Sequence, residues 1–581
     1  MKRKSFLKTI SFLGISTLVS LSATSCNALK TTEPIKEFKT DLKPETPINT
    51  ETPINKKNSD PLIDNARAEL TNIIKDKQSK INLYADYSKI KETLESAYNP
   101  SESINTNPDS TLEQLQKAIA DLQSAIDTAA NNKEQFNNAN EALIREFNSL
   151  KVTLNNKDEK LNSINQDKYS GIKFHLNSLY EVAENIVQSG LQPNGSLEVS
   201  SVMTANNSIK DEISLIDSQK INADKFADYE RFNINQTNFK GTFTKTGMQN
   251  SDYSIVAFNS DLDFNFKLAN RIIKQENKSQ NLSDTKELTN VAWIYDLNGT
   301  QNPMYQFEFT YYGPASATLY FPYKLAKAND KDNLSLKYKL NDLELQDIVL
   351  NDPKVDDIKV AAIRLSNLAF GKNTISFTTD NNKVTPMIGN MYISSINSSA
   401  EKVYNDIFSN ELSNNSNSIT INFIKGYGIA NKSDTIIRKL NAALDDSGSP
   451  KDHYLIGYLG NGGSTNPKTN EKYYSFYVNA PQSGAYTISG SINSGENRGL
   501  RFWSGTYENQ QNIVKFLNLK SGDNWSGLKS FSSSTNTMNN KKTITLEKGI
   551  NKIFVSADEA TKDAPNLGNV TFTLTPSSNP S

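Results

Sequence analysis

The stretch Gly549-Ile550-Asn551-Lys552-Ile553-Phe554-Val555 decides the fold of the C-terminal half of the chain. Its glycine permits a tight turn, and the residues that follow form an apolar, strand-like run. The same pattern occurs upstream as Gly371-Lys372-Asn373-Thr374-Ile375-Ser376-Phe377. The repetition predicts that one kind of β-domain occurs twice in the chain.

Two further pairs of segments repeat in the same order. Tyr312-Gly313-Pro314-Ala315-Ser316 corresponds to Asn479-Ala480-Pro481-Gln482-Ser483, and Pro386-Met387-Ile388-Gly389-Asn390 corresponds to Pro565-Asn566-Leu567-Gly568-Asn569. Apolar and polar residues alternate from about residue 229 onward, which favours strands with one buried face. We therefore expect two tandem antiparallel β-sandwiches, module 1 at 229–400 and module 2 at 401–578. The segments 479–486 and 546–553 resemble those of jelly-roll carbohydrate-binding modules.

The alternation is clearest in three runs, each of which predicts a strand. They are Leu262, Phe264, Phe266 and Leu268; Tyr305, Phe307, Phe309 and Tyr311; and Ala317, Leu319, Phe321 and Tyr323.

Residues 62–228 show helical periodicity instead. Leu112, Leu115, Ile119, Leu122 and Ile126 are three or four positions apart, after an N-cap expected at Asp109 or Ser110. The segment from Tyr87 to Tyr98 recurs 82 residues later as Tyr169 to Tyr180. We expect two helical repeats, 62–137 and 138–228, each of three helices, with His175 and Tyr180 on the surface or at a seam. The repeats resemble helical modules of Gram-positive and mycoplasma surface proteins.

The N-terminus reads as an export signal. Basic residues precede an apolar run from Phe6 to Leu21, and small residues lead into Cys26, the only cysteine. This pattern resembles a bacterial lipobox, apart from Ala23 where leucine is usual. We expect a lipoprotein signal peptide at 1–25, a diacylglyceryl or palmitoyl lipid on Cys26, and a disordered, proline-containing tether at 26–61. The protein would then be anchored to the outer face of the cell membrane.

Composition excludes several classes of function. The net charge is −1, from 63 basic and 64 acidic residues, which gives no electrostatic reason to expect a nucleic acid partner. With one cysteine the domains cannot be joined by disulfides, and with two histidines, His175 and His453, no histidine-rich metal site is expected. Neither a metal nor any cofactor beyond the lipid is predicted.

The chain as a whole resembles the variable lipoprotein haemagglutinin family of mycoplasmas. The blocks that carry this resemblance include Val291-Ala292-Trp293-Ile294-Tyr295, Leu319-Tyr320-Phe321-Pro322-Tyr323-Lys324 and Pro386-Met387-Ile388-Gly389-Asn390-Met391-Tyr392. The tether has less proline and glycine than is usual in that family, and it contains no clear processing site. The resemblance implies a surface lipoprotein that binds host sialoglycoproteins and agglutinates erythrocytes.

Sugar sites combine aromatic faces with amide, carboxylate or guanidinium groups. The residues in module 2 and module 1 that fit this chemistry are Trp503, Arg501, Tyr507, Trp525, Asn569 and Asn390. For each of them the structural alternative is a role in the core or in a turn, and Trp293 is expected to be core.

Other motifs have structural explanations. Gly460-Asn461-Gly462-Gly463 is not followed by a helix, so we interpret it as a loop between strands, and Asp356-Asp357 fits a solvated turn better than a calcium site. No nucleophile motif is present, and we predict that the protein is not an enzyme. The leading hypothesis is a glycan-binding adhesin. The alternative is antigenic display, or binding of a host protein through the helical repeats.

Overall fold

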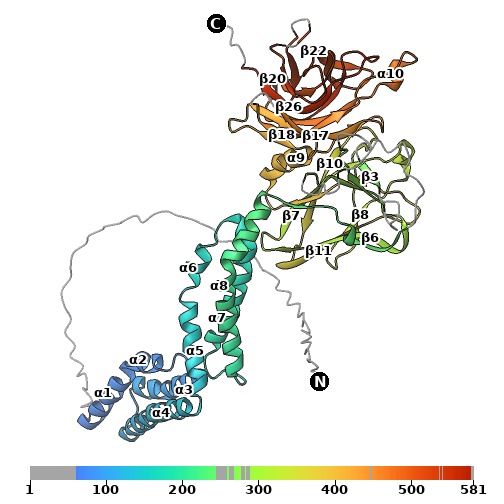
Figure 1. Ribbon diagram of the computed structural model, residues 1–581. Helices are drawn as coiled ribbons and strands as arrows, with labels where there is room; N and C mark the ends of the chain where they lie inside the picture. Colours follow the sequence, from blue (N-terminus) through green and yellow to red (C-terminus); the bar gives the residue numbers. More distant parts are fainter. Residues whose placement is uncertain are drawn as a thin grey trace, which may run out of the picture. The chain divides into compact units, whose positions relative to one another are not determined.

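The computed structural model describes residues 60–243, 258–260, 267–275, 282, 288–444, 448–535, 537–538 and 541–576. The predicted signal peptide, Cys26, the tether up to residue 59, and positions 262–266 of the predicted Leu262–Leu268 strand lie outside these residues. Residues 65–581 group into one compact unit. In the described part of this unit, helices come first and antiparallel sheets follow (Figure 1).

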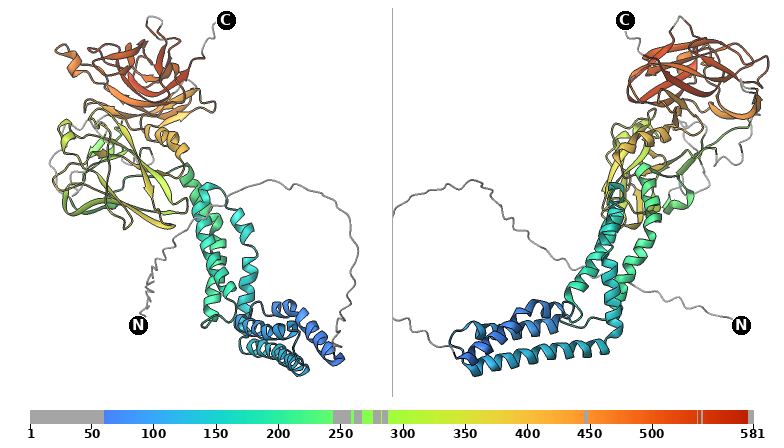
Figure 2. Two further views of the ribbon diagram at one scale, coloured as in Figure 1. Left: turned by 180° about the vertical axis from the view of Figure 1, so that it is seen from behind. Right: turned by 90° about the vertical axis from the view of Figure 1, so that its left-hand side faces the viewer.

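The helices occur in the same order in both repeats. The first repeat contains α1 (Pro61–Lys75), α2 (Lys77–Asn82), α3 (Ser88–Thr106) and α4 (Leu112–Ala139), and the second contains α5 (Glu141–Leu154), α6 (Lys157–Asn162), α7 (Ser170–Ser189) and α8 (Val199–Asp228). Each repeat therefore has a short helix in addition to the three expected. Helices α3 and α4 lie side by side, and α5 and α7 both lie along α8 (Figure 2).

The 82-residue repeat has a structural basis in a buried tyrosine. Tyr98 and Tyr180 are both fully buried, so Tyr180 is a core residue and not a surface one. A lysine lies over each ring, Lys77 at 5.6 Å from the Tyr98 centroid and Lys157 at 6.0 Å from that of Tyr180. Each lysine also forms an ion pair of 2.8 Å with a glutamate of the neighbouring helix. The predicted N-cap of α4 was wrong, since Thr111 caps it in a capping box with Gln114.

Module 1 is a sandwich of an eight-stranded and a five-stranded antiparallel sheet. The larger sheet has the order β1-β13-β7-β12-β5-β4-β3, with β10 added beside β7, and the smaller sheet has the order β2-β6-β11-β8-β9. The strands are β1 (Glu230–Phe232), β2 (Phe239–Phe243), β3 (Phe258–Ser260), β4 (Lys267–Arg271), β5 (Ala292–Asp296), β6 (Gly299–Tyr311), β7 (Ser316–Lys324), β8 (Lys337–Leu340), β9 (Gln346–Asp347), β10 (Lys359–Ser366), β11 (Gly371–Thr378), β12 (Met387–Ile388) and β13 (Met391–Ser394).

Module 2 follows helix α9 (Ala400–Phe408) and repeats this architecture. Its larger sheet has the order β14-β15-β26-β18-β17, with β20, β23 and β24 joined to it, and its smaller sheet has the order β16-β19-β25-β21-β22. The elements are β14 (Asn410–Leu412), β15 (Ser418–Ile421), β16 (Ile429–Ala430), β17 (Ile436–Leu444), β18 (Pro450–Gly457), α10 (Pro467–Asn470), β19 (Tyr474–Ala480), β20 (Gly484–Asn493), β21 (Arg498–Gly505), β22 (Gln510–Leu519), β23 (Lys529–Ser532), β24 (Thr543–Leu546), β25 (Gly549–Ala557) and β26 (Asn566–Leu574).

The turn before the central strand of each smaller sheet is the same in both modules. Gly371 and Gly549 have φ angles of +100° and +95°, a region that favours glycine. Two residues later, the Asn373 side chain donates to the carbonyls of Ala369 and Gly371 and accepts from the Ala369 N–H at 2.9 Å. Asn551 makes the equivalent three bonds with Glu547 and Gly549. The duplicated motif therefore builds the same turn twice.

One hydrophobic cluster draws on both modules and on the helix between them. Its members come from module 1, from α9 and from module 2; they are Ala269, Val291, Trp293, Tyr320, Ala326, Ile358, Met387, Tyr392, Val403, Ile407, Phe408, Tyr427, Ile429 and Tyr477. Trp293 lies in this core, as expected. Strand β7 is buried on both faces, because Leu319 and Phe321 face the interior of module 1 while Tyr320 faces this shared cluster.

Side chains cross the boundary between the modules in both directions. The Tyr427 hydroxyl of module 2 donates to the Ala292 carbonyl at 2.8 Å and accepts from the Asn390 N–H at 2.8 Å. The buried Arg271 of module 1 donates through Nη1 to the carbonyls of Phe423 and Gly426. Each module thus satisfies backbone groups that belong to the other.

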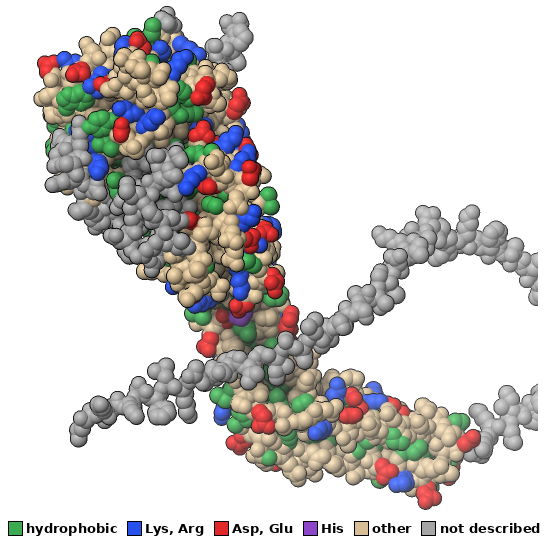
Figure 3. Space-filling model, turned by 90° about the vertical axis from the view of Figure 1, so that its right-hand side faces the viewer, with side chains coloured by type: hydrophobic (Ala, Val, Ile, Leu, Met, Phe, Trp, Pro, Cys, Tyr) green, Lys and Arg blue, Asp and Glu red, His purple; other side chains and the backbone are tan. Residues whose placement is uncertain are grey.

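None of the helices in the described ranges has the length and apolar content needed to cross a membrane. On the face drawn in Figure 3, Lys and Arg side chains are interspersed with Asp and Glu side chains over both the helices and the β-modules.

We expect Tyr427→Phe to lower the free energy of unfolding by about 2 kcal/mol or more, because it leaves two buried backbone groups without a partner. Urea denaturation of the purified protein measures the change. Tyr404→Phe is the matched control, since Tyr404 packs against the same cluster from its partly exposed edge. Equal stability of the two variants would contradict a structural role for the Tyr427 hydroxyl.

Candidate functional site

The outer face of the smaller sheet of module 2 carries a groove of about 1090 Å³. Along β19, β21 and β25, alternate side chains face the core, so that the intervening residues form this outer face. We call it the Glu471 groove; it is lined by Asp356, Ile429, Asn431, Lys432, Lys468, Thr469, Glu471, Tyr473, Ser475, Arg501, Tyr507, Glu508, Asn509, Gln510, Ile513, Lys515, Phe554, Asp558, Glu559 and Ala560.

A buried ion pair forms the floor of the groove. Arg501 Nη2 donates to Glu471 Oε2 at 2.7 Å, and Arg501 Nη1 donates to the Ala557 carbonyl at 2.7 Å. The Glu471 carboxylate also accepts from the hydroxyls of Tyr507, at 2.6 Å, and Ser556. Glu471 is 0% exposed and Arg501 is 5% exposed, so the charges of the pair are neutralised away from water.

Two tyrosines form an aromatic wall above this pair. The rings of Tyr473 and Tyr507 are stacked, with centroids 4.8 Å apart and an angle of 15° between their planes. Burial raises the pKa of Tyr473 to about 12. Burial and the hydrogen bond to Glu471 raise the pKa of Tyr507 as well. The hydroxyl of Tyr507 is thus committed to Glu471, as its donor.

The structure brings three of the predicted site residues together. Arg501 and Tyr507 line the Glu471 groove, and Trp503 lies beneath it. Trp503 is fully buried: its ring stacks on Phe554 at 5.3 Å, and the Arg501 guanidinium lies 4.9 Å from its centroid. The prediction that Trp503 offers a face to a sugar is therefore corrected, because both neighbours cover it. It supports the floor instead.

The other three predicted residues lie elsewhere. Trp525, between β22 and β23, packs against the Arg498 guanidinium at 4.7 Å. Asn569 is exposed within β26, on the larger sheet of module 2. Asn390 is buried and its amide contacts the backbone of Ile234 and Asn290, so its prediction as a glycan-binding residue is corrected to a core role.

Glu471 and Tyr473 were not predicted from the sequence. Tyr473 is two residues before Ser475 and four before Tyr477, which lie on the outer face of β19. This alternation in the sequence could have predicted that Tyr473 lies on the same face. Glu471 directly follows the short helix α10 and reaches Arg501 only because the fold brings β21 beside it. The role of Glu471 in the groove could therefore be recognised only in the structure.

Module 1 has the equivalent face but different chemistry on it. Registering the two smaller sheets on their shared turns places Ser376 at the position of Phe554 and its neighbour Lys339 at the position of Trp503. The hollow there measures about 680 Å³ and is lined largely by polar side chains, including Gln306 and Thr374. The aromatic residues beneath and beside the groove therefore belong to module 2.

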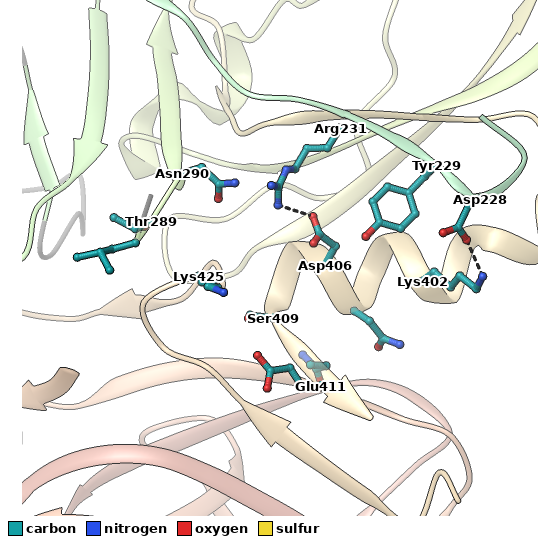
Figure 4. A pocket seen from close by; sticks show the side chains of 13 residues that line it. Asp228, Tyr229, Arg231, Thr289, Asn290, Lys402, Asp406, Ser409, Glu411 and Lys425 are labelled. Atoms are coloured by element: carbon teal, nitrogen blue, oxygen red, sulfur yellow. Dashed lines mark hydrogen bonds and ion pairs between the residues drawn. The ribbon is translucent and has the colours of Figure 1, made fainter. Parts of the chain in front are cut away.

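A third hollow, of about 650 Å³, lies where the end of α8, β1 and α9 meet (Figure 4). Arg231 pairs with Asp406 at 3.0 Å and Lys402 pairs with Asp228 at 2.6 Å. Burial raises the pKa of Tyr229, which also lines this hollow, to about 12. These ion pairs join β1 and the end of α8 to α9. The residues that line this hollow therefore hold three segments of the chain together.

Within the described residues, no group of three or more His, Cys, Asp and Glu side chains is placed to hold a metal ion. Asp357, considered above as part of a turn, accepts from the Tyr477 hydroxyl of module 2 at 2.9 Å.

A family model described as Mycoplasma haemagglutinin matches residues 229–353 and 344–575. A second one, the FIVAR domain, matches residues 66–130 and 146–216, which lie in the two helical repeats. The comparison with curated proteins found no significant match.

Among solved structures, the chain is similar to a family 35 carbohydrate binding module from Clostridium thermocellum (19% identity, 24% of this chain and 87% of that chain, TM-score 0.17). It is also similar to a β-1,3-glucan binding CBM6 from Bacillus halodurans (11% identity, 24% and 85%, TM-score 0.17). A third is an Arthrobacter globiformis T6 isomalto-dextranase complexed with panose (12% identity, 48% and 34%, TM-score 0.20). These identities and TM-scores are too low to carry over a ligand.

Because Arg501 is buried, we expect Glu471→Leu to destabilise the protein by about 3–5 kcal/mol by leaving that cation without its partner. Changing both residues, Glu471→Leu with Arg501→Met, should recover most of this loss. Thermal or urea unfolding measures both variants. A double variant no more stable than the single one would contradict this explanation.

Proposed function

The chain belongs to the Mycoplasma haemagglutinin family, and from this and the site geometry we propose that it is a cell-surface adhesin that binds host glycans in the Glu471 groove. The observation that carries the proposal is the stacked pair Tyr473 and Tyr507 above a buried, neutralised ion pair. A sugar ring has an apolar face that stacks on aromatic rings and hydroxyls that need polar partners, and the groove supplies both. The proposal includes no catalytic step.

Sialylated glycans are the proposed ligands, although Arg501 is not the group that takes their carboxylate. Its guanidinium is engaged by Glu471 and by the Ala557 carbonyl. Lys432, Lys468 and Lys515 also line the groove, and none of the three forms an ion pair with another described residue, although Lys515 is near enough to Glu559 to help lower its pKa. We propose that one of these ammonium groups pairs with the sialic acid carboxylate.

We also propose that Cys26 carries a lipid that anchors the chain to the membrane, as the N-terminal sequence predicts. Two acyl chains suffice for stable anchoring, since each buried CH₂ contributes about 0.8 kcal/mol. Many anchored copies on one cell would turn a weak glycan site into strong adhesion through multivalency.

A second candidate function is binding of a host protein through the helical repeats. Several apolar side chains of the second repeat are exposed, such as Phe174 (78%) and Ile221 (63%). A hollow of about 400 Å³ between α7 and α8 is lined in part by Leu179, Val182 and Ile186. Capture of a serum protein by the full chain, lost on Phe174→Ser and Val182→Ser, would support this function.

Tyr507→Ala should abolish agglutination of red cells by beads coated with the protein, because it removes half of the aromatic wall. Tyr507→Phe keeps the ring and should retain most of the activity. Tyr458→Ala, which changes a partly exposed tyrosine of module 2 outside the groove, is the control. Full agglutination by Tyr507→Ala would refute binding in this groove.

Sialidase treatment of the red cells should remove agglutination by the unchanged protein, because it removes the carboxylate that the lysines are proposed to bind. Agglutination that persists after complete desialylation would show that the ligand is not a sialylated glycan.

Cys26→Ser should shift the protein from the detergent phase to the aqueous phase in phase partitioning of whole cells, since the lipid can no longer be attached. The same variant should still bind glycans after purification. Retention of Cys26→Ser in the detergent phase would exclude this residue as the anchor.

A further inference from the structure

The Glu471 groove is not built by module 2 alone. All its lining residues come from module 2 except Asp356, which belongs to the loop between β9 and β10 of module 1. This loop lies against the smaller sheet of module 2, where Asp357 accepts from the Tyr477 hydroxyl and the Asp356 carbonyl accepts from Lys552. Ile358, next in the chain, belongs to the shared hydrophobic cluster.

These contacts hold the backbone at Asp356 and on its C-terminal side. Its main-chain carbonyl is used in the contact with Lys552, while its side chain is exposed at the groove. The carboxylate lies close enough to Tyr473 to help raise the pKa of that tyrosine, after the larger effect of burial. A charged acceptor is thus placed beside the aromatic wall by a loop whose residues Asp356 and Asp357 bond to module 2.

We infer that Asp356 is a ligand-binding residue of the groove, whose carboxylate accepts hydrogen bonds from the hydroxyls of the bound sugar. The inference rests on the proposed function of the groove. It means that the binding site spans two modules and is complete only when they are locked together. A carboxylate has two acceptor oxygens and can receive two neighbouring hydroxyls of one sugar ring.

The proposal and simple electrostatics predict opposite changes in affinity for an acidic sugar when the Asp356 charge is removed. If Asp356 were only a negative charge near the groove, its removal would strengthen binding of an acidic sugar. If it accepts hydrogen bonds, its removal weakens binding, because a hydrogen bond to a charged group contributes more than Coulomb repulsion between separated charges in a water-exposed groove.

The test compares Asp356→Asn with Asp352→Asn in the full-length protein, using calorimetric titration with a sialylated oligosaccharide. Asp352 lies on the same loop, but its carboxylate pairs with Lys331 at 2.8 Å and does not line the groove. We expect Asp356→Asn to weaken binding about tenfold or more and Asp352→Asn to leave it unchanged. Asp356→Asn should unfold at the wild-type temperature, since the Asp356 carbonyl and its contact with Lys552 remain. Asp352→Asn should change the unfolding temperature little, because it removes only ion pairs with the exposed Lys331 and Lys354.

Binding by Asp356→Asn that equals or exceeds the wild-type affinity would overturn the inference. Tyr507→Ala, titrated in parallel, separates this result from failure of the proposed function. Loss of binding in Tyr507→Ala alone would overturn only the role of Asp356. Unchanged binding in both variants would overturn the role of the groove as well.

Discussion

The contact between the two β-modules is the constraint on which the rest of the structure depends. Tyr427 enters module 1 and Arg271 enters module 2, and each satisfies backbone groups on the far side. Because buried polar groups are costly to leave without partners, separating the modules would expose an apolar cluster and also break these bonds. The modules therefore behave as one body, although their sequences are repeats of one unit.

This contact also explains why two copies of one fold present different faces. The Asp356–Ile358 loop of module 1 packs against one side of the smaller sheet of module 2, and the rest of that sheet face forms the Glu471 groove. The Trp503–Phe554 stack beneath the groove has no counterpart in module 1, where Ser376 and Lys339 occupy the positions of Phe554 and Trp503. Duplication supplied the scaffold, and substitution on one sheet face supplied a binding surface.

The sequence was sufficient to predict the architecture. Periodicity separates the helical repeats from the sandwiches, and the Gly-x-Asn turn at Gly371 and Gly549 marks the centre of each smaller sheet. Prediction from the sequence failed for residues whose burial depends on the neighbouring module. Tyr320 sits at a position that the alternation assigns to solvent, yet the shared cluster covers it. Asn390 is internal for the same reason, since Tyr427 closes over its backbone.

The candidate site was only partly predictable. Arg501, Trp503 and Tyr507 could be grouped because they are close in sequence. Which of these side chains lies buried beneath the groove and which lines it could be determined only from the strand register. Glu471 is 30 residues from Arg501 in the chain, and Asp356 belongs to another module, so no local pattern connects them.

The most direct test of the central claim is a crystal structure of the protein with a sialylated oligosaccharide bound. The account predicts a sugar ring stacked on the Tyr473–Tyr507 wall, with its hydroxyls at Asp356 and its carboxylate at a lysine of the groove. Sugar bound only on the polar sheet face of module 1, or on the helical repeats, would contradict it.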